Sequence, residues 1–348
     1  MAKAGLDIGE LLLKIATGET GEISKVDYAA QKPRFNSVCV SDEQPLERSS
    51  PESQGVSSAF FTSLLRDLSE TKECKMHKFM ALRNGKVICE CAFAPYSIDY
   101  WHVSYSMCKS IVAMAIGILI DEGKLTLIDT LEDIFSEYKG KFKLHKKTIT
   151  VKNLLDMTSG SEFNEAGSIS GNDWVKGFLE AGTKFEPGTQ FEYNSMNTYM
   201  LSAIVTQKTG KSLFDFCKER IFDPLGIKRF EYMRCPEGYF YGASGAKLTV
   251  NDLSKLGLLL YNKGIFDGER ILSEKYVKEA TSIQQMNREG GYGFFIWKYL
   301  DGFSINGKWG QKCYVLPERK LIVSFLSHIE DDTSPLRKSM EMNCLEIS

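Results

Sequence analysis

The sequence predicts an α+β fold in which one antiparallel sheet is assembled from both halves of the chain around a helical middle. Two observations predict the sheet: short apolar runs at 77–93, and further runs at 291–326, are separated by Asn-Gly, Asp-Gly or Pro-containing turns. A third predicts the helices, because apolar residues recur at helical spacing between these two regions. Strands at both ends with helices between them favour a sheet with a helical insertion over two consecutive domains.

Composition excludes several classes of protein. The 348 residues include 43 basic and 45 acidic ones, which leaves no electrostatic footprint for nucleic acid or an anionic membrane. The apolar run at 11–13 is too short for a signal peptide or a membrane span. Of nine cysteines only Cys89 and Cys91 are close, on one face of a predicted strand, with no second pair at metal spacing. We therefore expect reduced thiols, no metal, no organic cofactor and a cytoplasmic location, and the oligomeric state stays open.

The first elements follow an N-terminal arm, residues 1–55, which contains a possible short helix at 11–15. Apolar residues at helical spacing predict a helix over 57–71. A β-hairpin follows over 77–93, since Asn84-Gly85 lies between two apolar runs and both turn positions need a positive φ.

The middle of the chain is predicted to be helical. The segment 106–122 is apolar almost all round, which is typical of a helix buried in a large core, and Gly123 ends it. Further helices are expected at 151–157, 174–180, 196–208, 213–221 and 251–263.

The C-terminal part returns to strands, expected at 291–300, 302–306, 310–316 and 320–326, and closes with a helix at 334–345. The resulting division is an arm (1–55) and a main domain (56–348). In that domain 56–105 and 240–348 form a sheet subdomain, and 106–239 form a helical one.

Common catalytic and phosphate-binding motifs are absent. No G-x-S-x-G nucleophile turn and no glycine-rich phosphate loop occurs, and the four histidines are interpreted as structural residues.

The remaining candidate for catalysis is a serine activated by a lysine. Ser-x-x-Lys occurs four times, but only Ser106–Lys109 opens a long apolar helix. There the helix dipole and unpaired N–H groups can stabilise an oxyanion, and the i, i+3 spacing places both side chains on one face. Burial would favour a neutral lysine amine that accepts the serine proton. The alternative is an N-capping serine with a surface lysine.

Several ordered stretches carry a resemblance. They begin with Trp-His-Val-Ser-Tyr-Ser-Met-Cys-Lys-Ser at 101–110 and continue at 131–135, 151–160, 185–188, 191–195, 224–226 and 242–256. Together with the strands that follow, they cover roughly residues 57–330 and resemble the serine β-lactamase and penicillin-binding-protein family. The most similar branch is the class C-like one with its esterase and amidase relatives. The resemblance implies a β-lactamase/transpeptidase-like fold, with the site between sheet and helices, and Ser106 as nucleophile.

By the same resemblance, Tyr193 in Tyr193-Asn194-Ser195 is the second catalytic element. A phenolate is favoured beside a cationic Lys109, so Tyr193 can relay a proton. The third position, usually Asn in penicillin-binding members, is Ser195 here. Asn194 or Asn197 is an alternative for the amide that contacts the substrate.

The third family element is Lys-Thr-Gly on a strand. The literal match, Lys208-Thr209-Gly210, follows a predicted helix and is interpreted as its C-terminal cap. We therefore assign the element to Lys308-Trp309-Gly310, which begins a predicted strand. The resemblance implies that Lys308 adds positive charge and that the backbone N–H of Gln311 joins that of Ser106 in the oxyanion hole. Trp309 replaces a small hydroxyl residue, which weakens the case for β-lactam or peptidoglycan substrates.

These residues predict a serine hydrolase that cleaves a small-molecule amide, ester or β-lactam through an acyl-serine. The alternative is a non-catalytic binding or scaffold protein with the same fold, although such a protein needs none of Ser106, Lys109 and Tyr193.

Overall fold

The structure is a computed structural model that describes residues 45–71, 74–138, 140–165, 173–228, 235, 238–329 and 334–344. The short helix expected at 11–15 and most of the expected arm lie outside the described residues.

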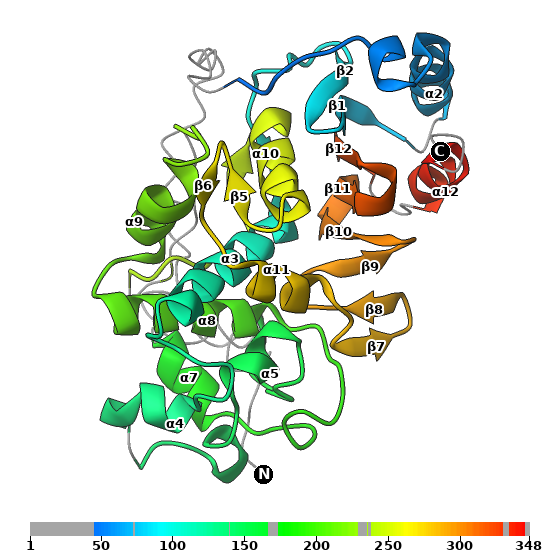
Figure 1. Ribbon diagram of the computed structural model, residues 1–348. Coiled ribbons are helices and arrows are strands. Elements are labelled where there is room, and N and C mark those ends of the chain that lie inside the picture. Colours follow the sequence, from blue (N-terminus) through cyan, green and yellow to red (C-terminus); the bar gives the residue numbers. More distant parts are fainter. Residues whose placement is uncertain are drawn as a thin grey trace.

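One antiparallel sheet of eight strands forms the centre of the fold, in the order β2-β1-β12-β11-β10-β9-β8-β7. The strands are β1 Met76–Arg83, β2 Lys86–Ala92, β7 Gln285–Asn287, β8 Gly290–Tyr292, β9 Trp297–Tyr299, β10 Gly302–Gly307, β11 Gln311–Leu316 and β12 Leu321–Ser327. The two halves of the chain meet where β1 pairs with β12, which sets Phe79 opposite Phe325 (Figure 1). The predicted sheet built from both ends is therefore present. The division into an arm and two subdomains stays a prediction.

The β1–β2 hairpin has the turn that the sequence predicted. Asn84 and Gly85 take φ values of 52° and 79°, the left-handed region that an Asn-Gly turn supplies at little cost. Cys89 and Cys91 lie on one face of β2, and both pack against the same hydrophobic cluster.

Both faces of the sheet are covered, since successive strand residues point to opposite sides. On one face Phe79 packs in a cluster with residues of α2 (Ser58–Glu70) and α12 (Ser334–Cys344). On the other face Met80 belongs to the larger cluster with residues of α3 (Cys108–Asp121) and α10 (Val250–Tyr261). Figure 1 shows α2 and α12 on one side of the sheet and α3 and α10 on the other.

Helix α3 is the buried helix that the sequence predicted, with every residue from Cys108 to Leu119 buried. Gly123 follows it with a φ of 67°. The remaining helices of the described ranges are α4 Leu131–Ile134, α5 Val151–Leu155, α7 Trp174–Glu180, α8 Ser195–Thr209, α9 Leu213–Cys217 and α11 Glu274–Thr281. Short strands form two further pairs, β3 His102–Val103 with β4 Lys247–Leu248, and β5 Ile265–Phe266 with β6 Glu269–Arg270.

Three details differ from the expected elements. The strand expected at 291–300 is divided into β8 and β9, because Phe295 between them has a left-handed φ of 57°. The helix expected at 213–221 ends as α-helix at Cys217 and continues as a π-helical turn, Lys218–Phe222. The elements α4, α11 and β3 to β7 were not expected at all.

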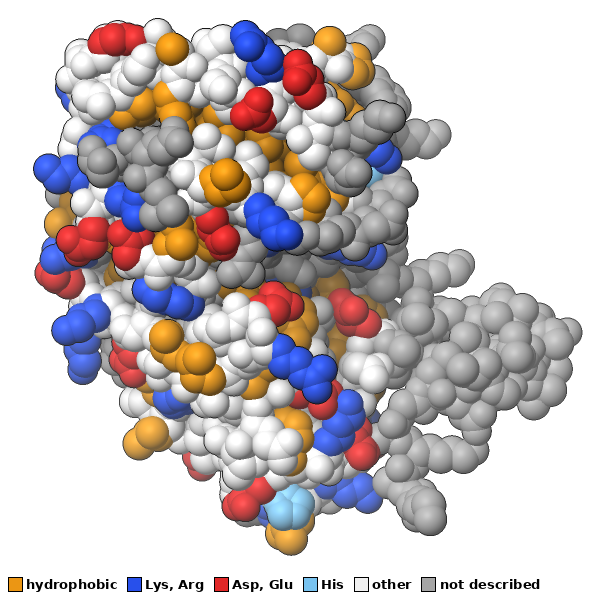
Figure 2. All heavy atoms as spheres, turned by 90° about the vertical axis from the view of Figure 1, so that its right-hand side faces the viewer, with side chains coloured by type: hydrophobic (Ala, Val, Ile, Leu, Met, Phe, Trp, Pro, Cys, Tyr) orange, Lys and Arg blue, Asp and Glu red, His pale blue; other side chains and the backbone are white. Residues whose placement is uncertain are grey.

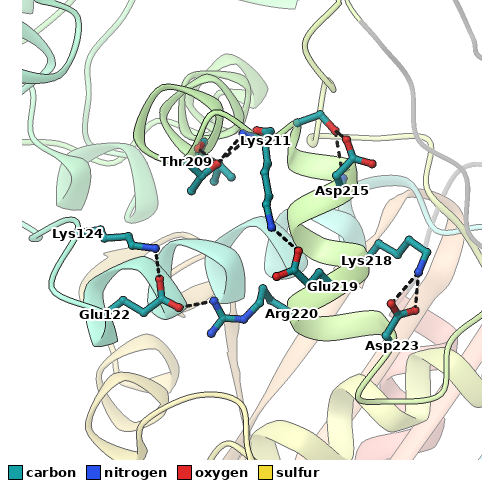
Figure 3. Close-up of polar contacts among 11 residues, drawn as sticks. Glu122, Lys124, Thr209, Lys211, Asp215, Lys218, Glu219, Arg220 and Asp223 are labelled. Carbon is teal, nitrogen blue, oxygen red and sulfur yellow. Dashed lines mark hydrogen bonds and ion pairs between the residues drawn. The ribbon is translucent and has the colours of Figure 1, made fainter.

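Charges of both signs are interspersed on the surface. Acidic and basic side chains alternate over the face shown in Figure 2. In Figure 3 Glu122, at the end of α3, pairs with Lys124 at 2.8 Å and also with Arg220 of the π-helical turn. Such exposed pairs contribute about 0–1 kcal/mol each, so they are a minor part of the stability. None of the helices in the described ranges is long and apolar enough to cross a membrane.

Candidate active site

Ser106 lies in a short 3₁₀ turn, Tyr105–Met107, that leads directly into α3. The sequence predicted that this serine opens the helix. The structure places it just before the helix, in a turn whose first residue, Tyr105, has a left-handed φ of 48°. Sγ of Cys108 donates to the Tyr105 carbonyl oxygen over 3.0 Å. Burial raises the pKa of the Cys108 thiol to about 11, so this thiol stays protonated and packs in the core.

Lys109 lies beside the serine at the start of α3. Its Nζ atom is 3.1 Å from Ser106 Oγ and 2.6 Å from the carbonyl oxygen of Ala243. The side chain is only 1% exposed. Both of these partners are uncharged oxygen atoms, and together they hold Nζ beside the serine hydroxyl.

Tyr193 also lies beside Lys109, with its ring centroid 5.2 Å from Nζ. The ring stacks on Trp297 of β9 at a centroid distance of 6.2 Å and an interplanar angle of 22°. Asn194 fixes the backbone here, since its Oδ1 accepts from the Met196 N–H and so caps α8. The side chain is 39% exposed, so it is open to solvent.

Neither of the two asparagines considered for substrate contact is available. Nδ2 of Asn194 donates to the carbonyl oxygens of Ser161 and Phe163. Asn197 is 0% exposed, and its Oδ1 accepts from Ser159 Oγ over 2.6 Å.

Ser195 is also nearly buried and lies against Tyr241, a side-chain hydrogen-bond partner. Burial raises the pKa of Tyr241 well above its usual value, and its hydroxyl donates to Glu165 over 2.5 Å.

The turn Lys308–Gly310 connects β10 to β11 and lies beside Tyr105. Trp309 takes a left-handed φ of 61°. The strain of that conformation is offset by hydrogen bonds, because the Trp309 carbonyl oxygen accepts from Gln311 Nε2, Ser327 Oγ and the N–H of Ile329. Gln311 Nε2 donates to Lys308 and Ser327 carbonyl oxygens as well. The Gln311 side chain therefore shapes the turn, and the role of its backbone N–H in the oxyanion hole stays a prediction.

Trp309 packs between two rings. Its centroid lies 5.0 Å from that of Tyr105 and 4.6 Å from that of His328. The Lys308 Nζ atom is 4.8 Å from the centroid of the same indole ring.

The literal Lys-Thr-Gly match in the sequence, Lys208-Thr209-Gly210, lies at the end of α8. Gly210 is the left-handed cap of that helix, with a φ of 69°.

Gly307, the last residue of β10, allows this turn to approach the nucleophile. A Cβ atom there would stand 2.4 Å from the carbonyl oxygen of Ser104 and 2.9 Å from Cγ of Met107. Gly307→Ala is therefore expected to push β10 away from the Ser106 turn and lower kcat/KM about tenfold, because catalysis is sensitive to sub-ångström misplacement.

The control is Gly268→Ala, where φ is +77° and nothing lies within 4 Å of the new Cβ. This variant measures backbone strain alone and is expected to lower Tm but not kcat/KM. Unchanged kinetics for Gly307→Ala would show that the close approach has no catalytic role.

A pocket of about 930 Å³ opens in front of Ser106. Among the described residues, Ser106, Tyr193 and Lys308 line it; the other predicted site residues, Lys109, Ser195, Trp309, Gly310 and Gln311, lie outside its lining. Its remaining lining residues are Thr189, Gln190, Phe191, Gln285, Met286, Asn287, Arg288, Glu289, Trp297, Asn306, Gly307 and Lys312. One wall is aromatic, since Phe191, Tyr193 and Trp297 surround Tyr292. None of these wall residues except Tyr193 was predicted from the sequence.

Three of the four histidines, interpreted from the sequence as structural, gather beside the Trp309 turn. His77 Nδ1 lies 2.8 Å from His102 Nε2, and the His77 and His328 rings stack at 6.5 Å. Burial and the neighbouring imidazoles lower the pKa of His77 to about 4. In the described part of the chain no group of three or more His, Cys, Asp or Glu side chains is placed to hold a metal ion.

Comparison with known proteins identifies the family. A family model described as Beta-lactamase matches residues 62–340. The chain is 25% identical over 235 residues to 6-aminohexanoate-dimer hydrolase of Paenarthrobacter ureafaciens, covering 61% of this chain and 59% of that one. The chain spans about three fifths of the length of the first curated relatives it matches.

Solved structures share the fold at lower identity. A penicillin-binding protein homologue from Caulobacter crescentus superposes with a TM-score of 0.67 and 16% identity, over 83% of this chain and 98% of that one. A family VIII carboxylesterase gives a TM-score of 0.67 and 18% identity, over 84% and 98%. The predicted β-lactamase/transpeptidase-like fold is confirmed. With four fifths of its length matched by the family model, the chain belongs to the β-lactamase family.

Proposed function

We propose that this chain is a serine hydrolase that cleaves an amide or ester through an acyl-serine intermediate formed on Ser106. The observation that carries the proposal is the contact of Lys109 Nζ with Ser106 Oγ, at 3.1 Å, in front of a pocket lined by Tyr193. Of the two buried lysine–serine contacts in the described residues, Lys109–Ser106 and Lys146–Ser161, the first has its serine in the pocket lining, which a scaffold protein does not need. Membership of a family that includes an amide hydrolase supports the same conclusion.

In the proposed reaction Ser106 Oγ attacks the substrate carbonyl carbon while Lys109 Nζ acts as general base and takes the hydroxyl proton. The developing oxyanion accepts hydrogen bonds from the backbone N–H groups of Ser106 and Gln311. As the tetrahedral intermediate collapses, the bond to the leaving nitrogen or oxygen breaks, and Tyr193 passes a proton to that atom.

Water then attacks the acyl-serine, with the same groups accepting and returning its proton. The products are a carboxylic acid and the amine or alcohol, and Ser106 is regenerated. Every proton is exchanged among the substrate, the water and these side chains, so the cycle needs no other reactant.

Linear amides or esters are the substrates that the pocket favours. The bulk of Trp309 occupies the position where penicillin-binding members carry a small hydroxyl residue, and Ser195 is buried against Tyr241. The aromatic wall of Phe191, Tyr193 and Trp297 offers an apolar surface for a carbon chain. β-Lactams are the competing substrate class, and a direct comparison with linear amides and esters tests this preference.

We also propose an intracellular location. It is supported by the free thiols of five described residues, Cys89, Cys91, Cys108, Cys217 and Cys313.

The test is covalent labelling. A fluorophosphonate probe is expected to label the wild type at Ser106, identified by peptide mass spectrometry, and to leave Ser106→Ala unlabelled. A panel of short-chain nitrophenyl esters, D-alanyl peptides and a chromogenic cephalosporin then ranks the substrate classes. Labelling at another residue would overturn the assignment of the nucleophile. A folded wild type that is neither labelled nor active would support the scaffold alternative.

A further inference from the structure

The pocket contains two asparagines, Asn287 and Asn306, each with one buried amide atom that has no hydrogen-bond partner among the described residues. They matter because Asn194 and Asn197, the asparagines close to Tyr193 in sequence, are bound to other protein groups. The pocket therefore lacks a substrate-contacting amide from the Tyr193 segment.

Asn306 lies on β10, one residue before Gly307, which packs against the Ser104 carbonyl next to the nucleophile turn. It lines the pocket, and its Oδ1 atom is buried with no hydrogen-bond partner among the described residues. Buried amide oxygens in native structures are rarely left unpaired, so an unpaired one in a pocket calls for a donor from a ligand. A substrate N–H near the scissile carbonyl is such a donor.

Asn287 lies at the other end of the pocket, on β7. Its Oδ1 accepts from the N–H of Glu289 over 2.8 Å, and this contact fixes which amide atom is the oxygen. The Nδ2 atom is left as a donor, buried and without a partner in the described part of the chain. Since β7 is three strands from β10 in the sheet, the two asparagines lie on the order of 14 Å apart.

We propose that Asn306 and Asn287 are specificity-determining residues that bind a linear substrate at two points. Asn306 Oδ1 accepts a hydrogen bond from an N–H close to the reacting carbonyl, and Asn287 Nδ2 donates to a carbonyl further along the acyl chain. The substrate class is accordingly an extended acyl chain with at least two amide groups. This inference rests on the proposed hydrolase function.

The experiment compares matched p-nitrophenyl esters. The N-acetylglycyl ester carries the N–H, and the 4-oxopentanoyl ester has a methylene in its place. The wild type is expected to prefer the first in kcat/KM by about three- to tenfold, the range for one uncharged hydrogen bond. Asn306→Ala is expected to abolish this preference by slowing only the N-acetylglycyl ester, whereas a merely structural defect would slow both esters equally.

The N-acetyltriglycyl ester tests the proposed contact with Asn287, because three extended residues span about 10–11 Å from the reacting carbonyl along the acyl chain. Its advantage over the N-acetylglycyl ester is expected to disappear in Asn287→Ala and to persist in Asn306→Ala. Asn262→Ala, at the exposed C-terminal cap of α10, is the matched control and is expected to keep both preferences.

Failure of this inference and failure of the hydrolase proposal give different experimental results. If a fluorophosphonate labels Ser106 but the wild type hydrolyses the ester pair equally, or hydrolyses neither ester, the roles of Asn306 and Asn287 are wrong and the nucleophile stands. If Ser106 is not labelled and no ester is cleaved, the hydrolase function itself is overturned.

Discussion

Lys109→Met is expected to lower kcat by about 10²- to 10⁴-fold, the usual contribution of a positioned general base. Methionine fills a similar volume but has no atom that can accept the proton of Ser106 Oγ, which now lies 3.1 Å from Nζ. The substrate pocket is unchanged, because Lys109 is not among its lining residues in the described part of the chain. KM is therefore expected to change far less than kcat. Steady-state kinetics on the best ester of the panel measures both constants.

Chemical rescue separates a base from a structural residue. Lys109→Ala leaves space for a small amine, so added methylamine is expected to restore part of the lost kcat in this variant and to do nothing for the wild type. Lys263→Met removes an exposed lysine paired with Glu274 and is expected to leave kcat unchanged. A Lys109→Met enzyme with kcat within threefold of the wild type would show that another group accepts the serine proton.

The catalytic pair was predictable because its geometry is local. Ser106 and Lys109 are three residues apart, so the helical turn alone brings their side chains to one face. The same holds for the β1–β2 hairpin, whose Asn84-Gly85 turn carries its own backbone preference. Neither feature needs information from a distant part of the chain.

The wall and the far end of the pocket depend on contacts that no local pattern records. Trp297 reaches Tyr193 only because β9 lies beside β10 in the sheet, and Asn287 belongs to the short strand β7 that has almost no apolar signal. The histidines illustrate the same limit. His77, His102 and His328 come from three separated segments, and only the assembled sheet brings their rings together.

The backbone at the site also departs from local preference. Tyr105 and Trp309 both take left-handed φ values, although aromatic residues seldom do. Hydrogen bonds from Gln311, Ser327 and Ile329 hold Trp309 there, and all come from the neighbouring strand ends. Sequence patterns cannot predict a conformation that tertiary contacts impose.

A second buried serine–lysine contact, Lys146 with Ser161, lies behind the Tyr193 segment. Lys146 is 0% exposed, its Nζ atom lies 4.3 Å from the centroid of the Phe178 ring, and the Ser161 carbonyl oxygen accepts from Asn194. Burial lowers the pKa of Lys146 from 10.5 to about 7, although the charge of Glu162 partly opposes the shift. An amine in this position is a stability determinant whose effect depends on pH.

Lys146→Met is expected to stabilise the protein, and to do so most at low pH. In the unfolded chain this lysine keeps its proton up to about 10.5, whereas the folded protein releases it near 7. Between these values the unfolded state binds more protons, so the free energy of unfolding of the wild type rises with pH. Below pH 7 the folded wild type carries the full cost of a buried ammonium, on the order of a few kcal/mol, and methionine removes that cost. Thermal unfolding at pH 6 and pH 9.5 is therefore expected to show a larger gain in Tm for the variant at pH 6. Lys263→Met, an exposed change, is expected to show no such difference, and an equal gain for Lys146→Met at both pH values would mean that Lys146 does not lose its proton on folding.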